Sequence, residues 1–179
     1  MSERDRLGRR RSPATRSEFH LGRPAPNKGK RYPRTSPTAA ELHALVRATS
    51  DDVEGARTRA LLALLWRAQL KVGEAVGLDV PDVDLVDGEV YVASRGVPSG
   101  LPPVANLDAW GLGCLRDWSD YRDELPGEAL LCTVRGPGKG DRWTAYGVRA
   151  VLAAAARRAG LTARITPELI RWAPVQDAP

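Results

Sequence analysis

The chain has 179 residues, enough for one domain with a substantial core, and its 42% hydrophobic and 27% charged residues are ordinary for a soluble globular protein. No apolar run reaches the roughly 18 residues that a membrane span needs, and the polar, arginine-rich start does not fit a signal peptide. These features exclude a membrane protein and predict a cytoplasmic one.

The net charge of +5 conceals two regions of opposite sign. Residues 1–35 hold eleven Lys or Arg against three acids, a net charge of +8, whereas residues 36–179 hold 16 basic and 19 acidic side chains, a net charge of −3. The first region is rich in Pro, Gly, Ser and Arg and cannot bury enough apolar surface to offset the entropy lost on ordering. We therefore predict a basic, disordered tail over 1–35 and a folded domain over 36–179.

The tail has two possible roles. Lys and Arg neutralise DNA phosphates and release counterions, so it can act as a DNA-binding arm. It can equally serve only as a linker or a solubilising segment. The candidate DNA-binding side chains in it are Arg9, Arg10, Arg11, Lys28, Lys30 and Arg31.

Three helices are predicted at the start of the domain. Thr38, with Glu41 three residues later, forms a capping-box pattern that begins the first helix. Apolar residues at helical spacing predict a second helix over 54–69, and a short third helix follows over 72–78.

The spacing of apolar residues then changes to the alternation that is typical of β-strands. Asp87-Gly88 predicts a hairpin turn between strands at 83–85 and 89–93. Another strand is predicted near 101–105, where two prolines restrict it to a sheet edge because proline cannot donate to a strand ladder.

Helical spacing returns after residue 106 in an apolar stripe that predicts one buried helix face, formed by Leu107, Trp110, Cys114, Trp118, Tyr121 and Leu125. A strand is expected over 129–134, followed by a flexible connector over 135–142. An alanine-rich helix over 144–160 then ends at Gly160, with Arg157 and Arg158 suited to its negative C-terminal end.

The two cysteines, Cys114 and Cys132, are far apart and belong to no CxxC pair. No histidine lies near them, so they do not have the spacing of a zinc site. We predict two buried, reduced thiols, no bound metal and no cofactor.

From about Asn27 to Trp172, the order of elements resembles the catalytic domain of tyrosine recombinases, the phage integrase family. That family carries a Gly-Leu-Arg-x-x-Glu-like motif, then Leu-x-x-x-Asp-(Val/Ile)-Asp before a β-hairpin, and later His-x-x-Arg-His. This sequence offers AQLKVGEAVGLDVPDVDL and TPELIRW. The resemblance implies an α+β, mainly α-helical fold with a small β-hairpin or sheet, lacking the family's C-terminal helices.

The family's activity is site-specific DNA strand cleavage and rejoining by a tyrosine. Two arginines hold the phosphate oxygens through their planar forks, a lysine on the hairpin donates a proton to the leaving oxygen, and histidines assist. At the first arginine position this chain has Lys71, and Glu74 matches the family's acid. The lysine position falls near Pro98, where Arg95 is the available cation.

In TPELIRW, Arg171 matches the second arginine, and Glu168 and Trp172 take the places of the two histidines. A carboxylate at position 168 would repel a phosphate. The family's tyrosine follows this motif by a few tens of residues, whereas Tyr32, Tyr91, Tyr121 and Tyr146 all precede it. We therefore expect no intact catalytic set.

The resemblance favours a catalytically inactive DNA-binding protein that contacts the phosphate backbone with low specificity, with Arg95 and Arg171 adding to the tail. The alternative is a protein-interaction or oligomerisation module, or a non-functional remnant of an integrase. In that case a second copy or a recombinase partner would cover the apolar surface left without the family's C-terminal helices, and any core exposed along the second helix would favour aggregation. Each site residue also has a structural alternative: Lys71 as a solvated helix-end cation, Glu168 as a first-turn acid, Arg171 as a surface or ion-paired residue, and Trp172 as a core residue or an exposed residue at the end of the fold.

Overall fold

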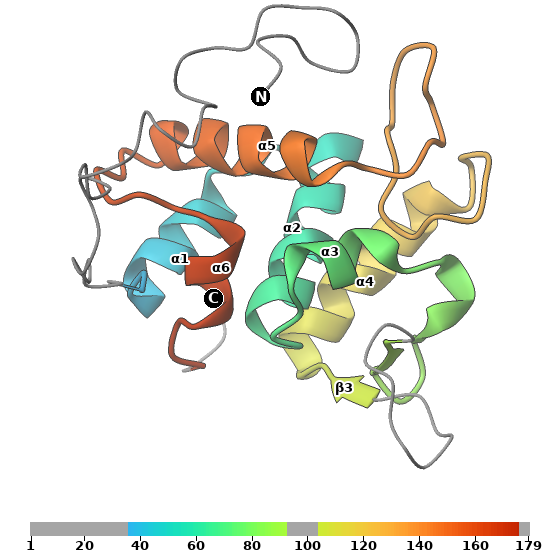
Figure 1. The fold of residues 1–179 in the computed structure, drawn as a ribbon, viewed down its shortest axis with the longest axis horizontal. Helices are drawn as coiled ribbons and strands as arrows, with labels where there is room; N and C mark the ends of the chain where they lie inside the picture. Colours follow the sequence, from blue (N-terminus) through green and yellow to red (C-terminus); the bar gives the residue numbers. More distant parts are fainter. Residues whose placement is uncertain (1–35, 93–103, 176–179) are drawn as a thin grey trace, which may run out of the picture. The chain divides into compact units, whose positions relative to one another are not determined.

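The computed structural model describes residues 36–92 and 104–175, and the predicted tail and Arg95 lie outside these residues (Figure 1). The described helices are α1 (Ala39–Arg47), α2 (Val53–Trp66), α3 (Val72–Gly77), α4 (Ala109–Arg122), α5 (Ala145–Arg158) and α6 (Pro167–Arg171). A 3-10 turn (Val80–Asp82) leads into three short strands, β1 (Val83–Asp84), β2 (Glu89–Tyr91) and β3 (Val104–Asn106). The predicted α+β, mainly helical class is confirmed.

Helix α2 is the centre of the core (Figure 1). Every residue from Gly55 to Trp66 except Arg59 is buried, because α2 packs most extensively against α4 and also contacts α3 and α6. Core is therefore not exposed along this helix. A helix that is apolar on all sides belongs in the interior, and here neighbouring helices cover its faces.

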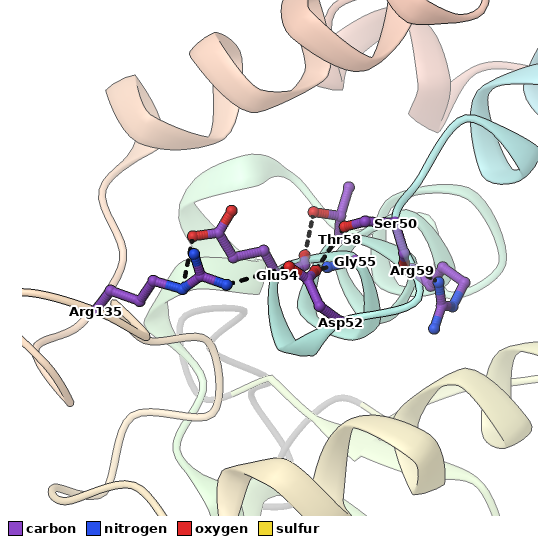
Figure 2. A network of polar contacts seen from close by, with 7 residues as sticks. All are labelled: Ser50, Asp52, Glu54, Gly55, Thr58, Arg59 and Arg135. Carbon is purple, nitrogen blue, oxygen red and sulfur yellow. Dashed lines mark hydrogen bonds and ion pairs between the residues drawn. The ribbon is translucent and has the colours of Figure 1, made fainter.

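A polar network fixes the start of α2, and Figure 2 shows it from close by. The Asp52 carboxylate accepts hydrogen bonds from the Gly55 N–H at 3.0 Å and from the Ser50 hydroxyl at 2.5 Å, which makes Asp52 the N-cap. Arg135 reaches across from the later loop and lies 3.1 Å from Asp52 and 3.5 Å from Glu54. This network joins segments more than 80 positions apart in the sequence.

The predicted caps of α1 and α5 are confirmed. The Glu41 N–H donates to the Thr38 hydroxyl at 3.2 Å, and the Thr38 N–H donates to the Glu41 carboxylate at 2.8 Å. Helix α5 has Thr144 as its N-cap, and Gly160 follows its end with a φ of +68°, a conformation that glycine adopts without strain.

The predicted hairpin is present, with shorter strands and a longer turn. Asp84 pairs with Glu89, so residues 85–88 form a four-residue loop. The Asp84 carboxylate accepts from the backbone N–H groups of Val86 and Asp87 at 2.7 and 3.1 Å. The turn therefore begins at residue 85, one residue before the start that the Asp-Gly pattern predicts. Strand β3 pairs with β2 and lies at the edge of the described sheet, as predicted.

The predicted stripe on α4 is only partly buried. Trp118 is fully buried and Cys114 nearly so, but Tyr121 has an exposed fraction of 40%. The buried face of α4 runs through Gly111, Cys114, Leu115, Trp118 and Arg122, so after Trp118 it continues at Arg122 and not at Tyr121. Tyr121 therefore lies at the solvent side.

The predicted strand at 129–134 does not form, and only single bridges occur there, Asp79 with Ala129 and Cys132 with Arg142. Side chains take the backbone acceptors that a neighbouring strand would use. Arg122 Nε donates to the Ala129 carbonyl at 2.8 Å, Trp118 Nε1 to the Leu130 carbonyl at 2.9 Å, and Arg57 Nη1 to the Cys132 carbonyl at 2.9 Å.

The connector at 135–142 is tied at both ends, so the prediction of a flexible link is wrong. Arg135 joins it to α2, and Arg142 joins it to the end of α3 by donating to the carbonyls of Val76 and Leu78, both at 2.9 Å. Arg142 also forms an ion pair with Asp79. The glycine-rich composition makes a tight turn here instead of a loose one.

Cys114 and Cys132 are buried and unpaired, as predicted. Burial raises the pKa of the Cys114 thiol to about 12, and burial likewise raises the pKa of Cys132. Both thiols are thus protonated and weakly nucleophilic near neutral pH. Within the described ranges, no helix is both long and apolar enough to cross a bilayer.

Candidate nucleic-acid interface

The two motif segments singled out in the sequence lie against each other. Arg171 Nε donates to the backbone carbonyl of Gln69 at 2.6 Å, which links α6 to the turn between α2 and α3. Gln69 itself has a φ of +51°, the left-handed conformation, and it occupies the glycine position of the family motif. The backbone at this turn thus aims a carbonyl at Arg171.

Lys71 stands at the start of α3 with its side chain 67% exposed. Its ammonium lies 3.7 Å from a Glu74 carboxylate oxygen, and its backbone N–H donates to the other oxygen at 2.7 Å. Glu74 is buried, so it stabilises the beginning of α3 and neutralises part of the Lys71 charge. The predicted helix-end position of Lys71 is confirmed.

Helix α6 is a single turn held by its apolar side. Ile170 is fully buried and Pro167 is buried beside it, while Trp66 Nε1 of α2 donates to the Pro174 carbonyl at 3.1 Å. These contacts fix the backbone that carries Glu168 and Arg171.

Arg171 and Trp172 lie on the outside of this turn. The guanidinium carbon of Arg171 is 4.8 Å from the centre of the Trp172 ring, and Trp172 is 59% exposed. The ring therefore supports the arginine by a cation–π contact and does not pack into the core. Of the two structural alternatives for Trp172, the exposed one applies.

Glu168 forms an ion pair with Arg149 of α5, with 3.4 Å between Oε1 and Nη2. Partial burial by itself would raise the pKa of Glu168, but hydrogen bonds from its own backbone N–H and the Thr166 hydroxyl, together with Arg149, hold that pKa below its ordinary value. Glu168 is therefore a carboxylate at neutral pH and adds negative charge between α5 and α6.

The sequence prediction missed the exposed arginines around α5. Residues 142–164 contain five arginines and no acid, and Arg149, Arg157, Arg158 and Arg164 are all exposed. The absence of acids over this stretch was the available signal. It was hidden by the net charge of −3 over the whole domain.

Among the described residues, three other arginines are buried, namely Arg57, Arg67 and Arg122. Arg57 stacks on Trp143 at 3.8 Å, and Arg67 stacks on Trp66 at 3.9 Å and pairs with Asp108 at 3.3 Å. Such positions cannot reach a phosphate without unpacking the core. The candidate interface consists of the exposed arginines on α5, the partly exposed Arg171 on α6 and the exposed Lys71 at the start of α3.

Comparison with known proteins identifies the family. The profile of the phage integrase family matches residues 37–173. The tyrosine recombinase XerD of Mycobacterium leprae is 33% identical over 156 residues, which covers 82% of this chain and 48% of that protein. The chain thus spans about half the length of the curated relatives it matches.

Solved structures show the same fold. XerA recombinase superposes with a TM-score of 0.65 at 21% identity, over 86% of this chain and 54% of that one. Lambda integrase bound to DNA superposes with a TM-score of 0.56 at 20% identity, over 79% of this chain and 50% of that one. The chain belongs to the phage integrase family and has the fold of the tyrosine recombinase catalytic domain.

Proposed function

We propose that this chain binds the DNA phosphate backbone as an integrase-family protein and does not itself cleave DNA, acting in the cytoplasm. The observation that carries the proposal is the position of Arg171. Its Nε donates to the Gln69 carbonyl at 2.6 Å, and Arg171 is partly exposed on α6. A guanidinium anchored through Nε presents its two terminal nitrogens as a fork for an anion.

The exposed face of α5 extends this cationic surface. Arg149 and Arg157 lie eight residues apart on the helix, about 12 Å along its axis. Between them the exposed residues are Ala150 and Ala153, whose small side chains allow a phosphate backbone to approach closely. Low sequence specificity follows, because phosphate contacts position a protein on DNA without reading bases.

Loss of cleavage rests on two changed positions. Lys71 supplies a single point charge, shared with Glu74, where the family uses a bidentate arginine. Glu168 places a carboxylate where the family has a histidine, and a carboxylate can neither donate a proton in its ionised form nor stabilise the added charge of a phosphorane-like transition state.

The basic tail completes the proposal. Its net charge of +8 would add electrostatic contacts to the duplex, with Arg9, Arg10, Arg11, Lys28, Lys30 and Arg31 as the main cations and Arg95 as a further one near the hairpin. Lambda integrase has been solved bound to DNA, and also as a dimer bound to a core site. By analogy a second copy or a recombinase partner can share the duplex with this chain.

The test is a salt titration of duplex binding by fluorescence anisotropy. It compares the full chain with a full-length variant in which the six tail cations are replaced by glutamine. We expect binding that weakens steeply as salt rises, with a smaller slope for the variant because it makes fewer phosphate contacts. Binding that does not change with salt would contradict the proposal.

A protein-interaction role is the second candidate, and exposed apolar side chains favour it. Trp172 and Val175 are 59% and 52% exposed, and they lie three positions apart in the sequence at the end of the described residues. If a second copy covers them, the mass measured by light scattering rises with protein concentration, and Trp172→Ser lowers it. A constant monomer mass for both proteins would count against self-association.

A further inference from the structure

The ion pair between α5 and α6 suggests how DNA binding is limited, and this inference rests on the proposed function. Arg149 has two described partners, and both contacts are long. Nη2 lies 3.4 Å from Glu168, and Nη1 donates to the Ala145 carbonyl at 3.3 Å. The side chains of Arg149 and Glu168 are 52% and 57% exposed, so a phosphate could reach the arginine if the carboxylate released it.

Glu168 is the better fixed of the two partners. It stands in the first turn of α6, whose backbone is anchored by buried Pro167 and Ile170, and it accepts from its own N–H and from Thr166. Arg149 projects from the middle of α5 on a long side chain. The carboxylate therefore stays in place while the arginine can turn either toward it or toward a ligand.

The same carboxylate is also a neighbour of Arg171. Positions 168 and 171 are three residues apart on α6, and such pairs lie side by side on a helix surface. One negative charge thus stands beside two of the cations proposed to bind phosphate. It competes with DNA for Arg149 and opposes the approach of a phosphate to Arg171.

We propose that Glu168 restrains DNA binding by holding Arg149 in an ion pair, which must open before Arg149 can bind a DNA phosphate. Removing the carboxylate strengthens duplex binding. The gain is moderate because an exposed ion pair is weak, so we expect an affinity increase of about threefold to fivefold at low salt.

The experiment is a double-mutant cycle on the full chain, read by anisotropy with a short fluorescent duplex of arbitrary sequence. It uses wild type, Glu168→Gln, Arg149→Gln and the double variant. We expect Glu168→Gln to bind more tightly than wild type, and we expect that gain to be at most half as large, in free energy, when Arg149 is already replaced. An equal gain in both backgrounds would overturn the proposal, because the carboxylate would then act only by general repulsion.

A matched control removes one charge elsewhere. Asp120→Asn changes an exposed acid on α4 and should leave duplex affinity within about twofold of wild type. An equal gain for Asp120→Asn would also overturn the proposal. If wild type and Glu168→Gln both fail to bind, the proposed function fails together with this inference; if both bind with equal affinity, only this inference fails.

Discussion

Two groups of arginines in this chain have opposite surroundings. Arg57 and Arg122 are buried and donate to backbone carbonyls at 2.9 Å or less, whereas Arg149 and Arg157 are exposed on α5. The buried arginines donate to carbonyls in residues 129–132 that a neighbouring strand would otherwise use, so they stabilise the fold. The exposed ones face solvent, and Arg149 there forms an ion pair with Glu168. Arginine content alone therefore does not locate a DNA-binding surface, and burial has to separate the two groups.

The scaffold should be most sensitive at Gly55, beside the buried group. A Cβ at this position would lie 1.7 Å from the Ser50 carbonyl oxygen, a backbone atom that cannot move without breaking the Asp52 cap. We expect Gly55→Ala to destabilise the fold by more than about 4 kcal/mol, the range of severe mutations. Urea unfolding followed by circular dichroism measures this. A loss below about 1 kcal/mol would show that the turn at Ser50 rearranges freely.

Arg122 tests the comparison directly. Its guanidinium donates to the carbonyls of Ala129, Leu125 and Gly127 at 2.8, 2.7 and 2.5 Å. Arg122→Met leaves these acceptors without their donor, and we expect a loss of about 3 kcal/mol in the free energy of unfolding.

The matched control for Arg122→Met is the same substitution on the exposed side. Arg157→Met should change the free energy of unfolding by about 0.5 kcal/mol or less, as at ordinary surface positions. Equal losses for the two variants would remove the distinction between scaffold and surface arginines.

Asp52 should affect stability less than Gly55 or Arg122. Hydrogen bonds from the Ser50 hydroxyl and the Gly55 N–H lower the pKa of Asp52 from its ordinary 3.8. Because the pKa of Asp52 is lower in the folded state than in the unfolded state, its ionised form stabilises the protein at any pH above the unfolded-state pKa. This stabilisation is lost as the pH falls through the folded-state pKa. We expect Asp52→Ala to cost about 1 kcal/mol at neutral pH, and the difference from wild type to shrink below pH 3.8. If the difference in unfolding free energy between Asp52→Ala and wild type did not change with pH, the negative charge of Asp52 would not contribute to the cap.

Features set by neighbouring residues could be predicted from the sequence. The Thr38 cap, the end of α5 at Gly160 and the position of Lys71 at a helix start all depend on residues within a few positions. The resemblance of two motif segments to the integrase family also located Arg171 and Glu168, which lie on α6, a helix that contacts α2 and α5.

Features that depend on distant partners could not be predicted. Arg57, which donates to the Cys132 carbonyl, lies 75 residues away in the sequence. The strand-like pattern of residues 129–134 therefore could not show that side chains occupy the carbonyls of this segment. The pairing of Arg149 with Glu168, 19 residues apart on two different helices, leaves no periodic signal either. Long-range side-chain contacts decide both the missing strand and the local charge of the candidate interface.

The most direct test of the central claim is a salt titration of duplex binding by wild type and by a variant with Arg149, Arg157 and Arg171 replaced by glutamine. If the exposed arginines bind phosphates, the slope of log affinity against log salt falls by about 3 in the variant, because about one counterion is released for each contact. Thermal unfolding of the two proteins should be similar. An unchanged slope in a folded variant would show that the surface formed by α5 and α6 does not bind DNA.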